Sequence, residues 1–209
     1  DLEIILLSDL GKYMTSGKSN KNPLPGIKPE KVATIIFTSG TISKPKGVML
    51  THHNLCADTI GCQKHLQLTG DTVLVLPLHH TFAFTANILY ALTCGFAICI
   101  PSSLKTIDET LKKYKPGSMM VVPLLVEAFY NKIWKTIREG KKEKLVKTMI
   151  KMSNALLKVG IDIRKKVFKQ IIDGLGGNLN MIISGGAALE PSYVQDFRSF
   201  GIDVFNGYG

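Results

Sequence analysis

Residues 37–48 form the segment whose residue types and spacing most clearly suggest chemistry. The segment follows an apolar run and reads Phe-Thr-Ser-Gly-Thr-Ile-Ser-Lys-Pro-Lys-Gly-Val. Hydroxyl and backbone N–H groups donate hydrogen bonds to phosphate oxygens, glycines let the backbone approach them, and lysines supply positive charge. A Walker A loop is excluded, because Pro45-Lys46-Gly47 stands where that motif needs Gly-Lys-Ser/Thr. We predict a phosphate-binding loop of another kind, with contacts from Thr38, Ser39, Gly40, Thr41, Ser43, Lys44, Lys46 and Gly47.

Three more polar clusters follow apolar runs later in the chain. They are His79-His80, Ser184-Gly185-Gly186-Ala187 and Asn206-Gly207-Tyr208-Gly209. Together with Thr38-Ser39-Gly40-Thr41, each lies where an expected strand ends. Open α/β sheets bind their ligands at the carboxyl ends of the strands. The four clusters therefore predict one site along one edge of a sheet.

The elements that must position these clusters are short apolar runs alternating with helical segments. The runs are continuous rather than alternating in polarity, which is typical of strands covered on both faces. Strand-like runs occur at Ala33–Phe37, Thr72–Leu76, Phe96–Ile100, Met119–Val122, Met181–Ile183 and Asp203–Phe205. Helical signals occur at Thr106–Tyr114, Val126–Glu139, Lys142–Lys158 and Ile161–Asp173, and after Glu190-Pro191. This alternation predicts an α/β fold with a mainly parallel sheet flanked by helices.

The uncharged stretch Phe82–Ile100 has two interpretations. Its nineteen residues could span a membrane, or they could form a buried helix followed by a buried strand. Gly95 divides the stretch, and Ile98 and Ile100 suit a strand. We therefore expect a helix over residues 84–94 followed by a strand.

The composition is that of a globular protein, and its charge is concentrated in one place. Hydrophobic residues make up 45% and charged residues 20% of the 209 residues, which excludes a disordered chain. Residues 131–170 contain thirteen Lys/Arg and three Asp/Glu, so this segment accounts for the whole net charge of +10. A solvated helical face explains such a segment, and so does contact with anionic lipid. Nucleic acid is not expected, because Trp134 and Phe168 are the only aromatic residues between Asn131 and Gln170.

Four cysteines among apolar neighbours suggest free thiols in a reducing compartment. No secretory signal opens the sequence. We expect a cytoplasmic protein, with the basic helices 131–170 able to contact the inner face of the membrane peripherally.

The phosphate-loop segment resembles the signature of the adenylate-forming, or AMP-binding, enzymes. That signature is Thr-Ser-Gly-Thr-Thr-Gly-x-Pro-Lys-Gly-Val, and the chain departs from it at Ile42 and Ser43. Pro77-Leu78-His79-His80 resembles a second motif of the family. The stretch from Val122-Pro123 to Ile133 is similar to long-chain acyl-CoA synthetases. The resemblance extends over nearly the whole chain.

The resemblance implies the roles of individual residues. Lys46 and His80 are implied to be catalytic, with His80 beside the acyl carboxylate and Phe84 at the gate of the acyl tunnel. The adenine and AMP are implied to lie against Gly185, Gly186, Ala187, Asn206, Gly207, Tyr208 and Gly209. Mg²⁺ is expected to arrive with ATP and to lie near Thr38.

The implied activity is a fatty-acid–CoA ligase reaction in two steps. A fatty-acid carboxylate attacks ATP to give acyl-AMP, and CoA then accepts the acyl group. We expect residues 1–209 to be a fragment of the large N-terminal AMP-binding domain, without the C-terminal domain and inactive alone. Two alternatives stay open: an adenylation domain that loads another acid onto a carrier protein, and a non-catalytic basic module that binds lipid or RNA.

Overall fold

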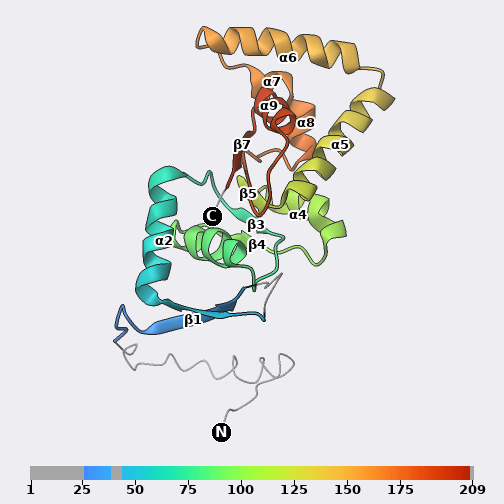
Figure 1. The fold of residues 1–209 in the computed structure, drawn as a ribbon. Helices are drawn as coiled ribbons and strands as arrows, with labels where there is room; N and C mark the ends of the chain where they lie inside the picture. The colour runs from blue at the N-terminus through green and yellow to red at the C-terminus, as the bar shows by residue number, and fades with distance from the viewer. Residues whose placement is uncertain (1–25, 39–43, 208–209) are drawn as a thin grey trace, which may run out of the picture.

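The computed structural model describes residues 26–38 and 44–207, and these residues form two sheets with helices around them (Figure 1). The larger sheet has five strands in the order β4-β3-β5-β6-β7, all paired in parallel. The smaller is an antiparallel hairpin of β1 and β2. The strands are β1 (Val32–Phe37), β2 (Gly47–Thr51), β3 (Thr72–Leu74), β4 (Ile98–Cys99), β5 (Ser118–Val121), β6 (Met181–Ser184) and β7 (Asp203–Asn206).

Helices cover both faces of the parallel sheet. Helices α2, η2 and α3 pack on one face, and α4, α5 and α9 pack on the other. Helices α6, α7 and α8 extend the second layer away from the sheet (Figure 1). The helices are α2 (His52–His65), the π-helix η2 (Ala83–Leu89), α3 (Tyr90–Thr93), the 3₁₀ turn η3 (Leu104–Thr106), α4 (Ile107–Tyr114), α5 (Pro123–Glu139), α6 (Glu143–Lys158), α7 (Arg164–Val167), α8 (Lys169–Gly174) and α9 (Pro191–Phe200).

The predicted α/β fold with a mainly parallel sheet is confirmed, and each of the six predicted strands is present. The place of the first strand was predicted wrongly, because β1 belongs to the hairpin and not to the parallel sheet. Only residues 38–46 separate β1 from β2. A connection this short joins antiparallel strands, whereas a parallel pair needs a longer crossover. Strand β2 is an addition to the strands predicted from the sequence.

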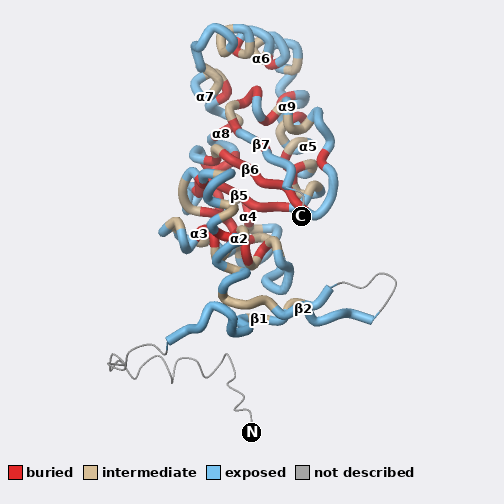
Figure 2. Tube along the Cα trace, turned by 60° about the vertical axis from the view of Figure 1, so that its left-hand side comes forward, coloured by how far each residue is buried: buried red, intermediate tan, exposed pale blue. Residues whose placement is uncertain are grey.

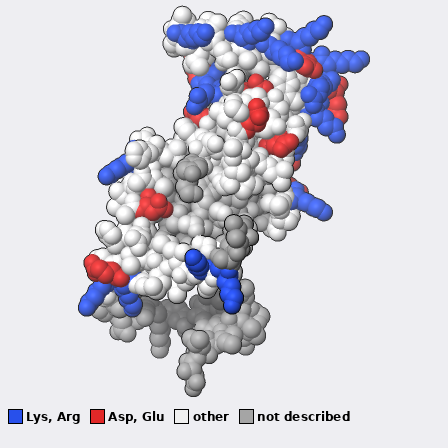
Figure 3. All heavy atoms as spheres, viewed as in Figure 1, with Lys and Arg blue, Asp and Glu red and all other residues white. Residues whose placement is uncertain are grey.

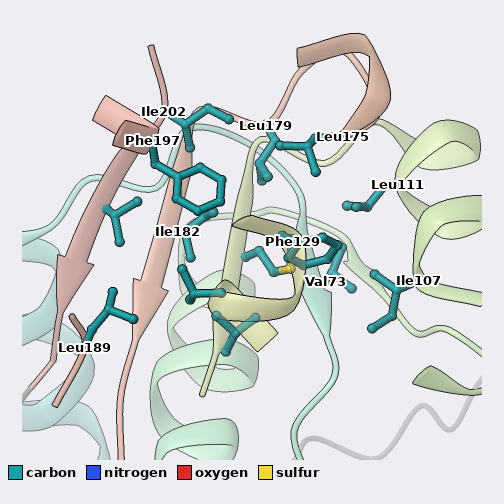
Figure 4. Packing of buried hydrophobic residues seen from close by; sticks show 14 of the residues in the cluster. Val73, Ile107, Leu111, Phe129, Leu175, Leu179, Ile182, Leu189, Phe197 and Ile202 are labelled. Atoms are coloured by element: carbon teal, nitrogen blue, oxygen red, sulfur yellow. The ribbon is translucent and has the colours of Figure 1, made fainter. Parts of the chain in front are cut away.

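The central strands β5 and β6 are buried on both faces, as their continuous apolar sequences predict. Met119 and Val121 of β5 face the larger core cluster, while Met120 between them faces the cluster on the opposite side. In β6, Ile182 joins Phe129, Phe197 and other residues of the larger cluster (Figure 4). Figure 2 shows buried residues concentrated in these strands. The sheet is therefore the middle of a three-layer packing.

The uncharged stretch Phe82–Ile100 folds as a helix followed by strand β4, in agreement with the prediction. Asn87 is fully buried in η2 and ties it to β3: its Oδ1 accepts from the Thr72 hydroxyl at 3.0 Å, and its Nδ2 donates to the Val73 carbonyl at 2.9 Å. A buried amide with partners on a neighbouring strand suits a packed core. Within the described residues, the helices are too short or too polar to cross a membrane.

The basic end of the molecule consists of helices α5 to α9. The helix predicted over residues 161–173 is divided into α7 and α8 at Phe168, whose ring is buried against Phe200. Asp196 links α9 to α5, since its Oδ2 accepts from the Tyr130 hydroxyl at 2.9 Å and from the Trp134 indole at 3.2 Å. Burial and this neighbouring carboxylate raise the pKa of Tyr130 to about 12. The phenol therefore stays a donor to Asp196 at neutral pH.

The cysteines of the chain, all within the described residues, are free thiols, as predicted. Burial raises the pKa of Cys62 and of Cys99, with Asp58 and Asp71 respectively adding to the shift. Less of each thiol is ionised at neutral pH than in an exposed cysteine, which lowers its reactivity.

The turn after α8 generates a prediction about stability. Gly176 has a φ of +96°, and a Cβ added to it would lie 2.3 Å from the Leu111 carbonyl oxygen. We expect Gly176→Ala to lower the free energy of unfolding by about 2 kcal/mol or more, because it adds backbone strain and a clash. Urea denaturation with an unchanged slope measures this loss.

Gly174 provides the matched control for Gly176. It ends α8, and a Cβ added there would meet nothing within 4 Å. Gly174→Ala should change the free energy of unfolding by no more than about 1 kcal/mol. Equal effects of the two substitutions would contradict the proposed close approach at Gly176.

Candidate active site

The carboxyl ends of the parallel strands meet at one edge of the sheet. Val121, Ser184 and Asn206 lie side by side as the last paired residues of β5, β6 and β7. The backbone N–H of Gly185 donates to the Val121 carbonyl at 3.0 Å, and that of Gly207 donates to the Ser184 carbonyl at 2.6 Å. The structure therefore places the polar segments after β6 and β7 next to each other.

The His79–Phe84 segment reaches the same edge through a close contact at Gly185. A Cβ added to Gly185 would lie 3.1 Å from the ring of Phe82. Glycine at this position therefore lets the start of the η2 segment approach the end of β6. The positions of these segments after expected strands predicted that they share an edge. The sequence did not indicate that Phe82 makes the contact.

His80 is exposed at the turn before η2. Its backbone N–H donates to the Pro77 carbonyl at 3.0 Å, and its ring Nδ1 accepts from the Phe82 N–H at 3.3 Å. Because Nδ1 is an acceptor, the neutral ring carries its proton on Nε2. The side chain therefore caps the following helical segment and presents an Nε2 donor.

Phe84 lines an apolar groove between η2 and the hairpin strand β1. The groove has a volume of about 420 Å³. His79, and not His80, is in its wall. The lining residues are Thr34, Ile35, Ile36, Phe37, Leu78, His79, Phe84 and Ile88. An apolar groove of this volume has room for an alkyl chain.

The phosphate-loop segment connects the two hairpin strands. Thr38 closes its base, since its N–H donates to the Lys46 carbonyl at 3.0 Å and its hydroxyl accepts from the Lys46 N–H at 3.2 Å. Lys44, Lys46 and Gly47 are exposed. The other predicted phosphate contacts, Ser39, Gly40, Thr41 and Ser43, lie outside the described residues, as do Tyr208 and Gly209 of the predicted adenine contacts.

The predicted adenine segment after β6 offers polar groups to a nucleotide. Gly186 and Ala187 are exposed, whereas Ser184 just before them is fully buried. The Ser184 hydroxyl is the one buried side-chain polar atom of the described chain that finds no hydrogen-bond partner there. Such groups are rare in folded proteins, and they occur at functional sites. Ser184 opens the predicted polar cluster after β6, but a serine at a strand end gives no sign in the sequence that its hydroxyl is buried without a partner.

Among residues 26–38 and 44–207, no group of three or more His, Cys, Asp or Glu side chains is arranged to hold a metal ion. Thr38 carries an exposed hydroxyl but has no carboxylate set around it. A Mg²⁺ that enters with a nucleotide would therefore depend chiefly on the phosphate oxygens for its ligands.

The chain belongs to the AMP-binding enzyme family, whose sequence pattern it matches over residues 3–209. It is 34% identical over 208 residues to long-chain-fatty-acid–CoA ligase 5 of Mus musculus, an alignment that covers 92% of this chain and 30% of the mouse protein. It is 31% identical over 209 residues to the peroxisomal long chain acyl-CoA synthetase 6 of Arabidopsis thaliana, covering 94% of this chain and 29% of the plant protein. The chain thus spans about a third of the length of these relatives.

Solved structures show the same fold at lower identity. The N-terminal domain of FACL13 from Mycobacterium tuberculosis matches with a TM-score of 0.64 at 15% identity, over 97% of this chain and 42% of that domain. A long-chain-fatty-acid-CoA ligase from Archaeoglobus fulgidus matches with a TM-score of 0.60 at 19% identity, over 98% of this chain and 36% of that protein. The layered α/β arrangement is therefore shared with these proteins.

Proposed function

We propose that the protein to which this chain belongs activates a fatty acid with ATP and transfers the acyl group to CoA. The observation that carries the proposal is the position of the apolar groove at Phe84. Strand β1, which leads into the phosphate loop, forms one side of the groove. The η2 segment forms the other side, and the start of this segment contacts Gly185 at the sheet edge. An alkyl chain and a nucleotide could therefore meet beside His80. Membership of the AMP-binding family and relatives that are long-chain ligases support this reading.

In the proposed reaction, the fatty-acid carboxylate attacks the α-phosphorus of ATP, and the bond to pyrophosphate breaks. The CoA thiolate then attacks the acyl carbon, and AMP leaves with the bonding electrons. Thr38 and Lys46 would hold phosphate oxygens, and the Nε2–H of His80 would orient the carboxylate. Gly186 and Ala187 would border the adenine, and bound Mg²⁺ would neutralise phosphate charge. Positioning and fixed charges supply most of the catalysis in such a reaction.

We also propose that these 209 residues are part of a large N-terminal AMP-binding domain and that a C-terminal domain completes the enzyme. The coverage of about a third of each relative supports this division. The segment would then supply the phosphate loop, the groove and part of the adenine site. We therefore expect no useful turnover from residues 1–209 alone.

Acid-dependent release of pyrophosphate by the intact protein tests the proposed function. We expect release with a long-chain fatty acid, and a CoA thioester as the product. His80→Ala should lower kcat/KM by about 10²-fold, because a donor aimed at the reacting group is lost. His53→Ala, an exposed histidine on α2, is the control and should keep full activity. An adenylate that forms without a CoA thioester would favour the carrier-loading alternative. Comparable turnover by the 209-residue chain would show that the proposed division is wrong.

The groove generates a prediction about chain-length preference. Phe84→Ala in the intact protein should shift the preference towards longer acids, because it lengthens the apolar space. Each buried methylene contributes about 0.8 kcal/mol, so two methylenes correspond to about a tenfold change in relative kcat/KM. Leu92→Ala on α3 is the control, since Leu92 is exposed and does not line the groove. An unchanged profile in Phe84→Ala, with normal ATP affinity, would argue against the acyl role.

We propose that the basic helices contact the membrane surface peripherally. Figure 3 shows Lys and Arg side chains gathering over α6 and the adjoining end of α5, and α6 also exposes Leu145 and Met152. Basic residues near an anionic surface contribute about 1 kcal/mol each, and salt screens the attraction. We expect flotation of the protein with phosphatidylglycerol vesicles at low salt and its loss at about 0.5 M salt. Equal flotation with neutral phosphatidylcholine vesicles would exclude this electrostatic contact.

A further inference from the structure

A second apolar cavity lies between α4, α5, α6 and α8, at the basic end of the molecule. Its volume is about 460 Å³, within the range of small-molecule sites. It shares no lining residue with the groove at Phe84. Among the described residues, none of the phosphate loop or of the sheet edge lines it. The proposed reaction therefore gives this cavity no role.

The cavity has a buried apolar interior and an exposed mouth. Phe129, Ile137, Val146, Phe168 and Leu175 line it and are each less than 10% exposed. Leu145, in contrast, is 58% exposed, and Lys132, Thr136, Lys142 and Gln170 are also exposed lining residues. An apolar interior that opens through a polar mouth suits a ligand with one apolar part and one polar end.

The charge at the mouth favours a negatively charged end. Lys132 is paired with Asp108, which also lines the cavity. Lys142 takes part in none of the salt bridges found among the described residues. Its ammonium group is therefore available at the mouth, within the segment that carries the whole net charge of the chain. An anionic group there would stay in contact with water and would avoid most of the cost of burying a charge.

We propose that this cavity binds the anion of a free fatty acid, with its alkyl chain inside and its carboxylate at the mouth beside Lys142. The volume lies towards the lower end of the usual range of ligand pockets, about 300–1,000 Å³, which suits one chain rather than two. The bound acid is held and not activated, because Thr38, Lys46 and the other described residues of the phosphate loop do not border the cavity. The site goes beyond the proposed function, since it is a second place for the same class of molecule.

Photo-crosslinking of the intact protein locates the bound acid. The probe is a sixteen-carbon fatty acid with a diazirine in its chain, and the ligase site is blocked with a non-hydrolysable acyl-AMP analogue. We expect crosslinks at residues 129–149 and 167–175, which mass spectrometry assigns by position. Among unlabelled competitors that still fit, each added methylene should improve binding about fourfold.

Paired substitutions on α6 separate cavity binding from general surface effects. Leu145→Trp fills the mouth and should reduce crosslinking at least about tenfold, a loss typical of one well-packed group. Met152→Trp, at a similarly exposed apolar position on the same helix that does not line the cavity, should leave crosslinking unchanged. Lys142→Glu should weaken binding about three- to tenfold, and Lys144→Glu, outside the lining, should weaken it much less. A cooperative urea transition with an unchanged slope confirms that each variant is folded.

Crosslinks confined to residues 77–88, or equal effects of Leu145→Trp and Met152→Trp, would overturn the inference. Equal losses of crosslinking in Lys142→Glu and Lys144→Glu, accompanied by vesicle binding, would also overturn the inference. They would indicate a membrane-contact surface in place of a cavity site. The result is independent of the proposed function. Crosslinks in the cavity of a protein that releases no pyrophosphate would support the cavity site and contradict the ligase. Pyrophosphate release by a protein that shows no crosslinks in the cavity would support the ligase and contradict the cavity site.

Discussion

The central strands of the parallel sheet are buried on both faces, and the location of the candidate site follows from this constraint. Met120 faces one helical layer while Met119 and Val121 face the other, so the sides of β5 have no room for polar chemistry. Polar groups can gather only where the strands end. Because neighbouring strands run in parallel, those ends lie at one edge, which brings Ser184 and Asn206 together.

Segments outside the sheet complete the site through specific contacts. Asn87 anchors η2 to β3 with two buried hydrogen bonds, and this fixes the helix that carries Phe84. The π-helical form of η2 is itself unusual, since such turns are rare and occur frequently at functional sites. Gly185 then admits the ring of Phe82, so the helix start and the sheet edge become neighbours. The hairpin strand β1 supplies the remaining wall of the groove.

The basic end is coupled to this arrangement through α5 and α9. Asp196 on α9 accepts hydrogen bonds from Tyr130 and Trp134 on α5, so the two helices hold each other in place. Helix α9 leads directly into β7, whose end is at the candidate site, and α5 forms a wall of the second cavity. This hydrogen-bonded helix pair therefore joins two regions that have different charge. The neutral part contains the proposed chemistry, and the basic part contains the proposed lipid contacts.

The sequence by itself determined the strands of the parallel sheet, most of the helices and the polar clusters that follow the strands. These are local properties: continuous apolar runs such as Met119–Val122 must be buried, and hydroxyl, glycine and lysine residues are concentrated in residues 38–47. Only the tertiary structure decided that β1 pairs with β2, that His79 lines the groove and that the Ser184 hydroxyl is buried without a partner. Pairing and cavities depend on which distant segments pack together. The composition of residues 142–175 likewise does not show that its helices enclose a cavity, because that space exists only once the helices have docked.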